Sequence, residues 1–208
     1  MIIIGDVHGC YKTLMALIDK LPKDRNITFV GDLIDRGPAS KEVVKFVRDN
    51  NYRCVRGNHE DMAKNNPTEW LKHGGMQSFN SYGDDEKQWE EDLEWLNSRP
   101  LFLEFPELKD EEGRVLLITH SSAGCCWELD KEGIEFPHMI MWNRKEPSSP
   151  EGYYNVFGHT PQREGNALLG EDFANIDTGV YFDDGLLTAM LFPEKKLITQ
   201  EVIDDVNY

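Results

Sequence analysis

Five short polar clusters combine residue types that could bind metal ions and act on a phosphate ester. Each cluster directly follows an apolar run: Gly5-Asp-Val-His-Gly9, Gly31-Asp-Leu-Ile-Asp-Arg-Gly37, Gly57-Asn-His-Glu60, Thr119-His-Ser121 and Gly158-His-Thr160. Carboxylates, an amide oxygen and neutral imidazoles, with no thiolate among them, suit Mn, Fe, Zn or Ni. The clusters therefore indicate a site for divalent cations.

The spacing within the clusters indicates two such cations. Asp6 and His8 are separated by one residue, so their side chains share a face of an extended segment. Asp32 has two carboxylate oxygens and could bridge two metals. Two metals about 3.5–4 Å apart are the usual clamp for in-line displacement at phosphorus. The predicted metal ligands are Asp6, His8, Asp32, Asn58, His120 and His159.

The remaining charged residues of the clusters could bind and protonate the substrate. Arg36 lies close to Asp32 in the sequence and could hold phosphoryl oxygens bidentately, and Arg144 is a second phosphate-binding candidate. His59 could protonate the leaving oxygen, with Asp35 holding its imidazole and raising its pKa. Taken singly, each cluster could also be an ordinary turn. The five together favour a catalytic site.

Alternating strands and helices must position these clusters. Apolar runs predict strands at Ile2–Ile4, Ile27–Val30 and Tyr52–Val55, with helices over residues 11–21 and 38–47 between them. Residues 65–97 have a helical pattern that is broken at Gly74-Gly75. Because ligands sit at the carboxyl ends of strands in layered α/β folds, the clusters converge only if these ends meet in one crevice.

The distal half of the chain has a pattern typical of strands. The predicted strands are Leu101–Phe105, Val115–Thr119, Asn155–Phe157, Ala174–Ile176, Leu186–Phe192 and Lys196–Val202. Turns at Glu112-Gly113 and Asp184-Gly185 predict two hairpins.

Composition limits the class of protein. The chain has 208 residues and a formal charge of −16, which fits one acidic domain and argues against binding duplex nucleic acid through its phosphates. No apolar stretch reaches the roughly 20 residues of a membrane span, and the N-terminus lacks a basic signal region, so we expect a cytoplasmic protein. The cysteines Cys10, Cys54, Cys125 and Cys126 are expected to be free thiols.

One segment carries much of the negative charge. Seven acids fall within residues 84–94: Asp84, Asp85, Glu86, Glu90, Glu91, Asp92 and Glu94. We interpret the segment as a solvated helix face, with an acidic docking site as the alternative.

The motifs quoted above resemble those of the calcineurin-like metallophosphoesterases. Within that group the chain resembles the phosphoprotein phosphatase branch, and most of all the bacteriophage lambda phosphatase and its bacterial relatives. Stretches Trp70-Leu-x-x-Gly-Gly75, Met141-Trp-Asn-Arg144 and Ile176-Asp-Thr-Gly179 add to the likeness. The resemblance covers residues 2–192 and implies an α/β (α+β) fold, a four-layer αββα sandwich. Residues 1–208 would form one catalytic domain with a helical, acidic insertion at about 65–97.

The resemblance also implies roles for the residues. The first metal would take Asp6, His8 and Asp32, and the second Asp32, Asn58, His120 and His159. His59 and Asp35 would be the acid pair, and Arg36 and Arg144 would bind phosphate together with Asn58 and His59. The two cations would be Mn²⁺, with Fe, Zn or Ni as alternatives. A hydroxide bridging them would attack phosphorus directly, without a phosphoenzyme.

The expected function is a metal-dependent phosphomonoesterase, namely a serine/threonine protein phosphatase that also accepts phosphotyrosine and aryl phosphates. Its partners would be phosphorylated proteins or peptides, small phosphate esters or dinucleoside polyphosphates. The alternatives are a symmetrical dinucleoside tetraphosphate hydrolase, a nucleic-acid-end phosphatase and, remotely, a non-catalytic metal-binding interaction module. Asp35 and Glu60 match the phosphatase form rather than the tetraphosphatase form. His73 is interpreted as a loop residue, with substrate contact as the alternative, and His138 is given no role.

Overall fold

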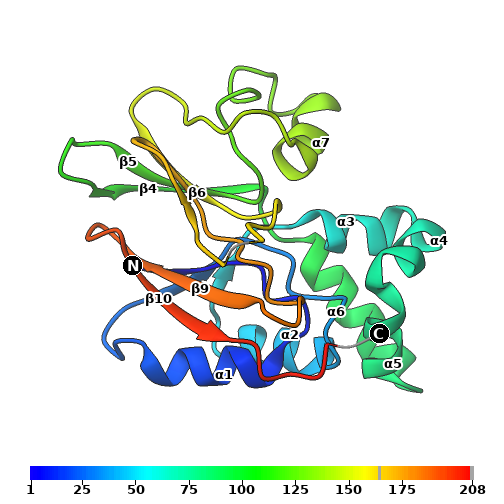
Figure 1. The fold of residues 1–208 in the computed structure, drawn as a ribbon. Coiled ribbons are helices and arrows are strands. Elements are labelled where there is room, and N and C mark those ends of the chain that lie inside the picture. Colours follow the sequence, from blue (N-terminus) through cyan, green and yellow to red (C-terminus); the bar gives the residue numbers. More distant parts are fainter. Residues whose placement is uncertain (164, 207–208) are drawn as a thin grey trace.

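Two five-stranded sheets lie face to face in the computed structural model, which describes residues 1–163 and 165–206 (Figure 1). The first sheet has the order β10-β9-β1-β2-β3 and the second the order β4-β5-β6-β8-β7. The strands are β1 (Ile2–Ile4), β2 (Ile27–Phe29), β3 (Arg53–Cys54), β4 (Phe102–Lys109), β5 (Val115–Thr119), β6 (Tyr153–Phe157), β7 (Leu168–Leu169), β8 (Phe173–Asn175), β9 (Leu186–Leu191) and β10 (Lys196–Glu201).

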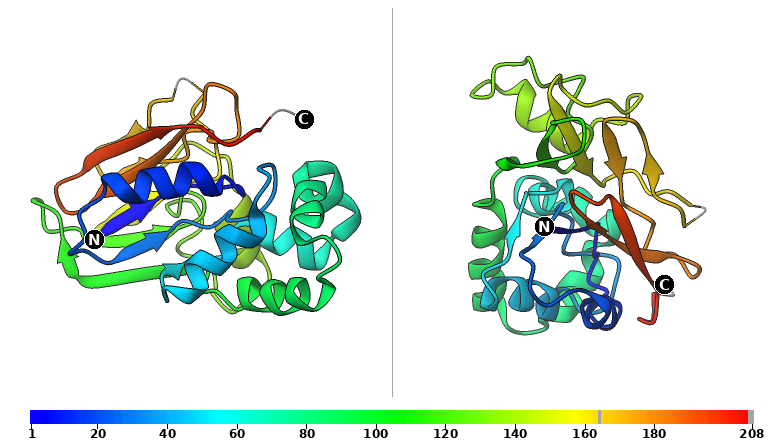
Figure 2. Two further views of the ribbon diagram at one scale, coloured as in Figure 1. Left: turned by 90° about the horizontal axis from the view of Figure 1, so that it is seen from below. Right: turned by 90° about the vertical axis from the view of Figure 1, so that its left-hand side faces the viewer.

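Helices cover the outer faces of both sheets. Helices α1 (Tyr11–Lys20) and α2 (Ser40–Asp49) lie under the first sheet, and α7 (Glu135–Trp142) lies over the second (Figures 1 and 2). Strand β1 shows why: Ile2 and Ile4 pack toward α1 and α2, whereas Ile3 packs between the sheets. Alternate side chains of a strand point to opposite faces, so one buried strand serves two core layers. The four-layer αββα sandwich predicted from the sequence is confirmed.

The strands that carry the polar clusters run parallel. In the first sheet β1, β2 and β3 are parallel, and in the second β5, β6 and β8 are parallel. Parallel neighbours place their carboxyl ends at the same edge of a sheet. The residues that follow β1, β2, β3, β5 and β6 are thereby brought to one side of the sandwich.

Residues 58–97 form a group of helices beside the sheets (Figure 1). They are α3 (Asn58–Asn65), α4 (Pro67–Trp70), the kinked turn η1 (Leu71–Gly75), α5 (Met76–Tyr82) and α6 (Glu86–Asn97). The predicted break is confirmed, because Gly74 has a φ of 101° that ends the helical path.

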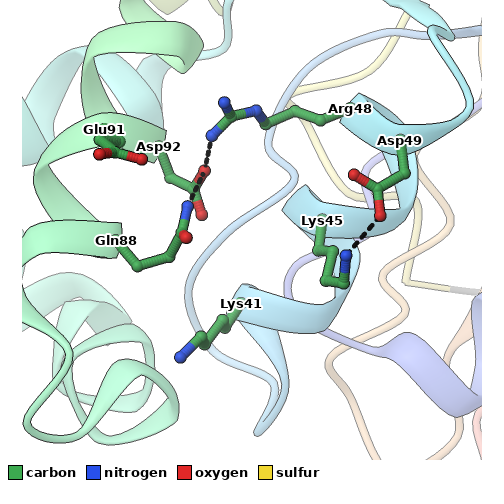
Figure 3. Close-up of a pocket in the computed structure, with 7 residues that line it drawn as sticks. All are labelled: Lys41, Lys45, Arg48, Asp49, Gln88, Glu91 and Asp92. Atoms are coloured by element: carbon green, nitrogen blue, oxygen red, sulfur yellow. Dashed lines mark hydrogen bonds and ion pairs between the residues drawn. The ribbon is translucent and has the colours of Figure 1, made fainter.

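The acidic segment 84–94 is only partly the solvated face that the sequence predicts. Six of its acids are exposed, but Asp92 is buried. Its carboxylate accepts hydrogen bonds from the Tyr82 hydroxyl (2.8 Å) and the Gln88 amide (3.0 Å), and pairs with Arg48 of α2 (Figure 3). The prediction was wrong for Asp92, because this acid fixes α6 against α2.

The distal half departs from the prediction in two further places. Residues 135–142 form the helix α7, a segment for which the sequence predicted no element; Phe136 and Ile140, one helical turn apart, face the second sheet. The hairpin expected at Asp184-Gly185 does not exist, because the chain crosses there from the second sheet to the first. The hairpin at Glu112-Gly113 joins β4 and β5 as predicted.

The cysteines are free, as expected; Cys10, Cys54 and Cys126 are buried and Cys125 is exposed. Among the described residues, no helix has both the length and the apolar character to cross a membrane.

Candidate active site

The five strand ends meet in one buried cluster that contains every predicted metal ligand. Asp6 and His8 follow β1, Asp32 follows β2, Asn58 follows β3, and His120 and His159 follow β5 and β6; all six are buried. Both sheets contribute to this cluster, and a single metal site built from these ligands requires that they lie together.

Short distances connect these side chains across the interface between the sheets. The Asn58 Oδ1 atom lies 2.8 Å from His120 Nε2 and 2.7 Å from His159 Nδ1. Asp32 Oδ2 lies 3.6 Å from His8 Nε2, and Asp32 Oδ1 lies 3.5 Å from His120 Nε2. Asp32 thus stands between two groups of ligand atoms, as a bridging carboxylate would.

The backbone at these residues is strained. Seven non-glycine residues of the described chain have a positive φ, and five of them belong to this site: His8, Asp32, Asp35, Arg36 and His159. Such conformations cost energy and persist where the surroundings enforce them, often at functional sites. The site is also tightly packed at Gly158, where a Cβ atom would overlap the Asp6 carboxylate.

The donor set fits divalent cations. Two groups of ligand atoms, one from His8, Asp32 and His59 and one from Asp6, Asp32 and His120, each lie within 4.8 Å of one another. Asp6 Oδ1 and His159 Nε2 are buried and have no hydrogen-bond partner among the described residues. Buried polar atoms normally have a hydrogen-bond partner. The lack of one at these two atoms is expected if they coordinate a cation.

The pKa shifts of the proposed ligands also favour a cation site. Burial raises the pKa of Asp6 well above its ordinary value, and the nearby carboxylates Asp177 and Asp32 raise it further. Burial lowers the pKa of His159 to about 3, with His120 adding to the shift. A neutral imidazole is the form that binds a metal ion. Buried carboxylates that lie close together are stabilised by a bound cation.

His59 and Asp35 form the predicted pair. His59 Nδ1 lies 2.6 Å from Asp35 Oδ2. Burial opposes the charged imidazole, but Asp32 and the hydrogen bond to Asp35 outweigh burial and raise the pKa of His59. The opposite nitrogen, Nε2, lies 3.4 Å from Arg36 Nη2, and His59 and Arg36 line the same cavity. An imidazole held in this way can donate a proton.

Asp35 is itself held by residues that the sequence reasoning gave no role. The Trp70 indole N–H donates to both carboxylate oxygens at 2.8 Å, and the Ser78 hydroxyl donates at 2.7 Å. Gly75 lets the Trp70 ring lie close, because a Cβ atom there would come within 2.5 Å of it. The Trp70-Leu-x-x-Gly-Gly75 likeness was the signal that could have found this support.

Glu60 is a second residue whose role was missed. Its Oε2 accepts from the backbone N–H groups of Asp32 (3.0 Å) and Gly57 (2.8 Å), and its Oε1 accepts from that of Leu33 (2.7 Å). Glu60 therefore ties the loop after β2 to the loop after β3 and fixes the spacing of their ligands.

Arg36 and Arg144 lie at the rim of the cluster. Both line a cavity of about 380 Å³ together with Asn58 and His59. The Arg36 guanidinium lies over the ring of Tyr181 at 4.1 Å, an aromatic contact that orients it and that the sequence did not reveal. The structure thus brings together all ten residues proposed for metal, proton and phosphate binding.

Comparison with known proteins gives a family match over most of the chain. The model of a family described as calcineurin-like phosphoesterase matches residues 1–183. A bis(5'-nucleosyl)-tetraphosphatase of the asymmetrical type from Halalkalibacterium halodurans is 34% identical, over 95% of this chain and 92% of that protein.

Two further relatives carry different names. Serine/threonine-protein phosphatase 1 from Salmonella typhimurium is 29% identical, over 91% of this chain and 90% of that protein. A symmetrical bis(5'-nucleosyl)-tetraphosphatase from Coxiella burnetii is 30% identical over 82% of this chain, which spans 57% of that protein.

Proposed function

The chain belongs to the calcineurin-like phosphoesterase family, and we propose that it hydrolyses dinucleoside tetraphosphates. The observation that supports this substrate is the 34% identity to an asymmetrical tetraphosphatase over nearly the full length of both chains. The sequence favoured a protein phosphatase and kept a tetraphosphatase, of the symmetrical type, as its alternative. The relatives support that alternative class better.

We propose that two divalent cations, Mn²⁺ first among them, occupy the cluster. His8 and Asp32, whose Nε2 and Oδ2 atoms lie 3.6 Å apart, would hold one cation with Asp6, and Asp32 with Asn58, His120 and His159 would hold the other. The ligand atom of Asp6 also lies near those of Asp32 and His120, and that of His59 near those of His8 and Asp32. When bound, they would supply Lewis-acid activation of water and of the phosphoryl group.

The residues at the rim then orient the substrate. Arg36 and Arg144 would bind the non-bridging oxygens of the phosphate that reacts, since both line the cavity beside the ligands. His59 would donate its Nε2 proton to the leaving oxygen while Asp35 holds Nδ1. Tyr181, Trp70 and Ser78 would keep Arg36 and Asp35 in place.

A serine/threonine phosphatase is the second function to consider. It is supported by the Salmonella relative and by Asp35 and Glu60, which match the phosphatase form. The structure adds that both residues are built into the site, Asp35 against His59 and Glu60 against three backbone N–H groups.

A parallel assay separates the two functions. The Mn²⁺-loaded protein is given diadenosine tetraphosphate, a phosphoserine peptide and a phosphothreonine peptide, and kcat/KM is measured for each. We expect the dinucleotide to be the better substrate by at least about ten-fold; the products, ATP with AMP or two ADP, identify the bond cleaved. Faster turnover of a phosphopeptide would overturn the proposal. Asp32→Asn, which replaces one carboxylate oxygen of the proposed metal site, should abolish both activities and serves as the control.

A further inference from the structure

The cavity of about 380 Å³ beside the proposed ligands has a side that the phosphate chemistry does not use. Its lining includes Trp142 and His138 from α7, and Met62 from α3. His138 and Trp142 are four residues apart and therefore on one face of α7. The cavity thus runs between two helices, with the metal-side residues at one part and an aromatic wall at another.

The aromatic wall leads outward from the metal cluster. The Trp142 ring meets the ring of His159 edge-on at 6.3 Å and is stacked with the ring of His138, with centroids 6.1 Å apart and planes 19° apart. Trp142 is half-buried and His138 is exposed. A flat indole beside a phosphate site is the platform on which an aromatic heterocycle stacks.

Two side-chain amides line the same cavity from the α3 side. Asn65 and Asn66, at the end of α3, line the cavity and are exposed. The Asn65 amide already donates to Asp61 Oδ1 (3.0 Å) and the Asn66 amide oxygen accepts from the backbone N–H of Glu69 (3.4 Å). The Asn65 oxygen as acceptor and the Asn66 amide N–H groups as donors are the atoms that could meet the edge of a base. His73 lines the cavity too, with its Nε2 atom 3.3 Å from Glu69 Oε1. The two histidines without a function in the sequence therefore border one space.

We propose that this wall is a nucleobase subsite: Trp142, backed by His138, stacks the base of a nucleotide whose phosphate is held by Arg36 and Arg144. The subsite rests on the proposed function, since it names the part of the dinucleotide that the protein would recognise. The recognised unit is one nucleoside with its adjacent phosphate, because the base wall and the metal-side residues line the same cavity. The protein would then cut close to that nucleoside and release AMP.

Binding measurements test the subsite separately from hydrolysis of the dinucleotide. Calorimetric titration of the Mn²⁺-loaded protein compares AMP with ribose 5-phosphate, which carries the same sugar and phosphate but no base. We expect AMP to bind about ten-fold more tightly or better. Trp142→Leu should remove most of that advantage and leave ribose 5-phosphate binding unchanged. Trp127→Leu is the matched control, because Trp127 packs on α7 through Phe136 without lining the cavity, and it should keep the advantage.

Equal binding of AMP and ribose 5-phosphate by the wild-type protein would overturn the subsite, so the proposal is decided even if Trp142→Leu fails to fold. The exposed His138→Ala variant then reports on the wall, with an expected loss of a few-fold in AMP affinity alone. The two proposals fail separately. Hydrolysis of diadenosine tetraphosphate with no advantage for AMP contradicts only the subsite. An advantage for AMP with no hydrolysis of the dinucleotide contradicts only the proposed function.

Discussion

At the scale of single residues, the site is defined by what each polar atom already contacts. His59 Nδ1 is engaged by Asp35, while Asp6 Oδ1 has no partner among the described residues. The first arrangement suits a proton donor and the second a metal ligand. The sequence predicted which residues would gather in the site, because their types and their order along the chain are specific. It did not predict the support from Trp70, Glu60 and Tyr181, since these contacts join distant parts of the chain.

The division between ligand and proton donor makes a first prediction. His59→Asn should lower kcat by about 10²–10⁴-fold with phosphoserine, whose leaving alkoxide needs a proton. The loss should be much smaller with para-nitrophenyl phosphate and with the dinucleotide, whose leaving groups are weak bases. Steady-state kinetics on the three substrates measure this pattern. Metal content, measured by mass spectrometry of the purified variant, should stay unchanged; its loss would make His59 a ligand instead.

At the scale of elements, the helices of residues 65–97 serve the site rather than standing apart from it. Trp70 of α4 and Ser78 of α5 both donate to Asp35, and Gly74 O accepts from the backbone N–H of Arg36. We propose that this segment is an insertion that sets the acid pair. Its helical pattern was readable from the sequence. Its contacts with Asp35 were not, because helical periodicity says which face is apolar but not what that face meets.

Trp70 gives a second prediction. Trp70→Phe keeps an aromatic ring against Trp89, which stacks on it at 5.2 Å, but removes the N–H donated to Asp35. Losing a hydrogen bond to a charged group costs about 1.5–3 kcal/mol. We expect kcat with phosphoserine to fall by about ten-fold with little change in KM. Trp89→Phe, which alters the same stack without touching Asp35, is the control; equal losses in both variants would refute a role through Asp35.

The β4–β5 turn gives a third prediction. Asp110 accepts from the Arg114 guanidinium (2.8 Å) and from Lys195 (3.0 Å), so it joins this turn to the β9–β10 turn of the other sheet. Burial alone would raise its pKa, but Lys195 and Arg114 lower the pKa of Asp110 to about 2.

A carboxyl group with a lowered folded-state pKa stabilises the fold above its unfolded-state pKa and loses that effect as the pH falls. Asp110→Asn should therefore reduce the free energy of unfolding by about 1–2 kcal/mol at neutral pH. The difference from wild type should shrink between about pH 4 and pH 2. Urea unfolding at several pH values measures it. A difference that stays constant down to pH 2 would contradict the role of the charge.

At the scale of the whole molecule, the sandwich explains how residues from 6 to 159 reach one point. Parallel strands in both sheets place their carboxyl ends at the same side, and the two sheets pack with β1 beside the interface. The layered fold was predictable from alternating apolar runs. The switch of the chain between sheets near Asp184 and the helix α7 were not, because turn residues and a short apolar run do not say which sheet or layer comes next.

The charge of the molecule is consistent with this arrangement. The formal charge of −16 would repel phosphates, but two dications would move it to −12 and concentrate positive charge with Arg36 and Arg144 in one crevice. The exposed acids of α6 lie on the helices beside the sheets. We therefore propose that affinity for phosphate belongs to the site and depends on the metals.

Metal counting tests the central claim, that one cluster built from five strand ends holds two divalent cations. The protein is stripped with a chelator, dialysed against Mn²⁺ and analysed by mass spectrometry, with electron paramagnetic resonance to detect coupling between ions. We predict two Mn²⁺ per chain, spin-coupled, in the wild-type protein and a marked loss of both in Asp32→Asn. One ion per chain, or two uncoupled ions that persist in Asp32→Asn, would contradict the account.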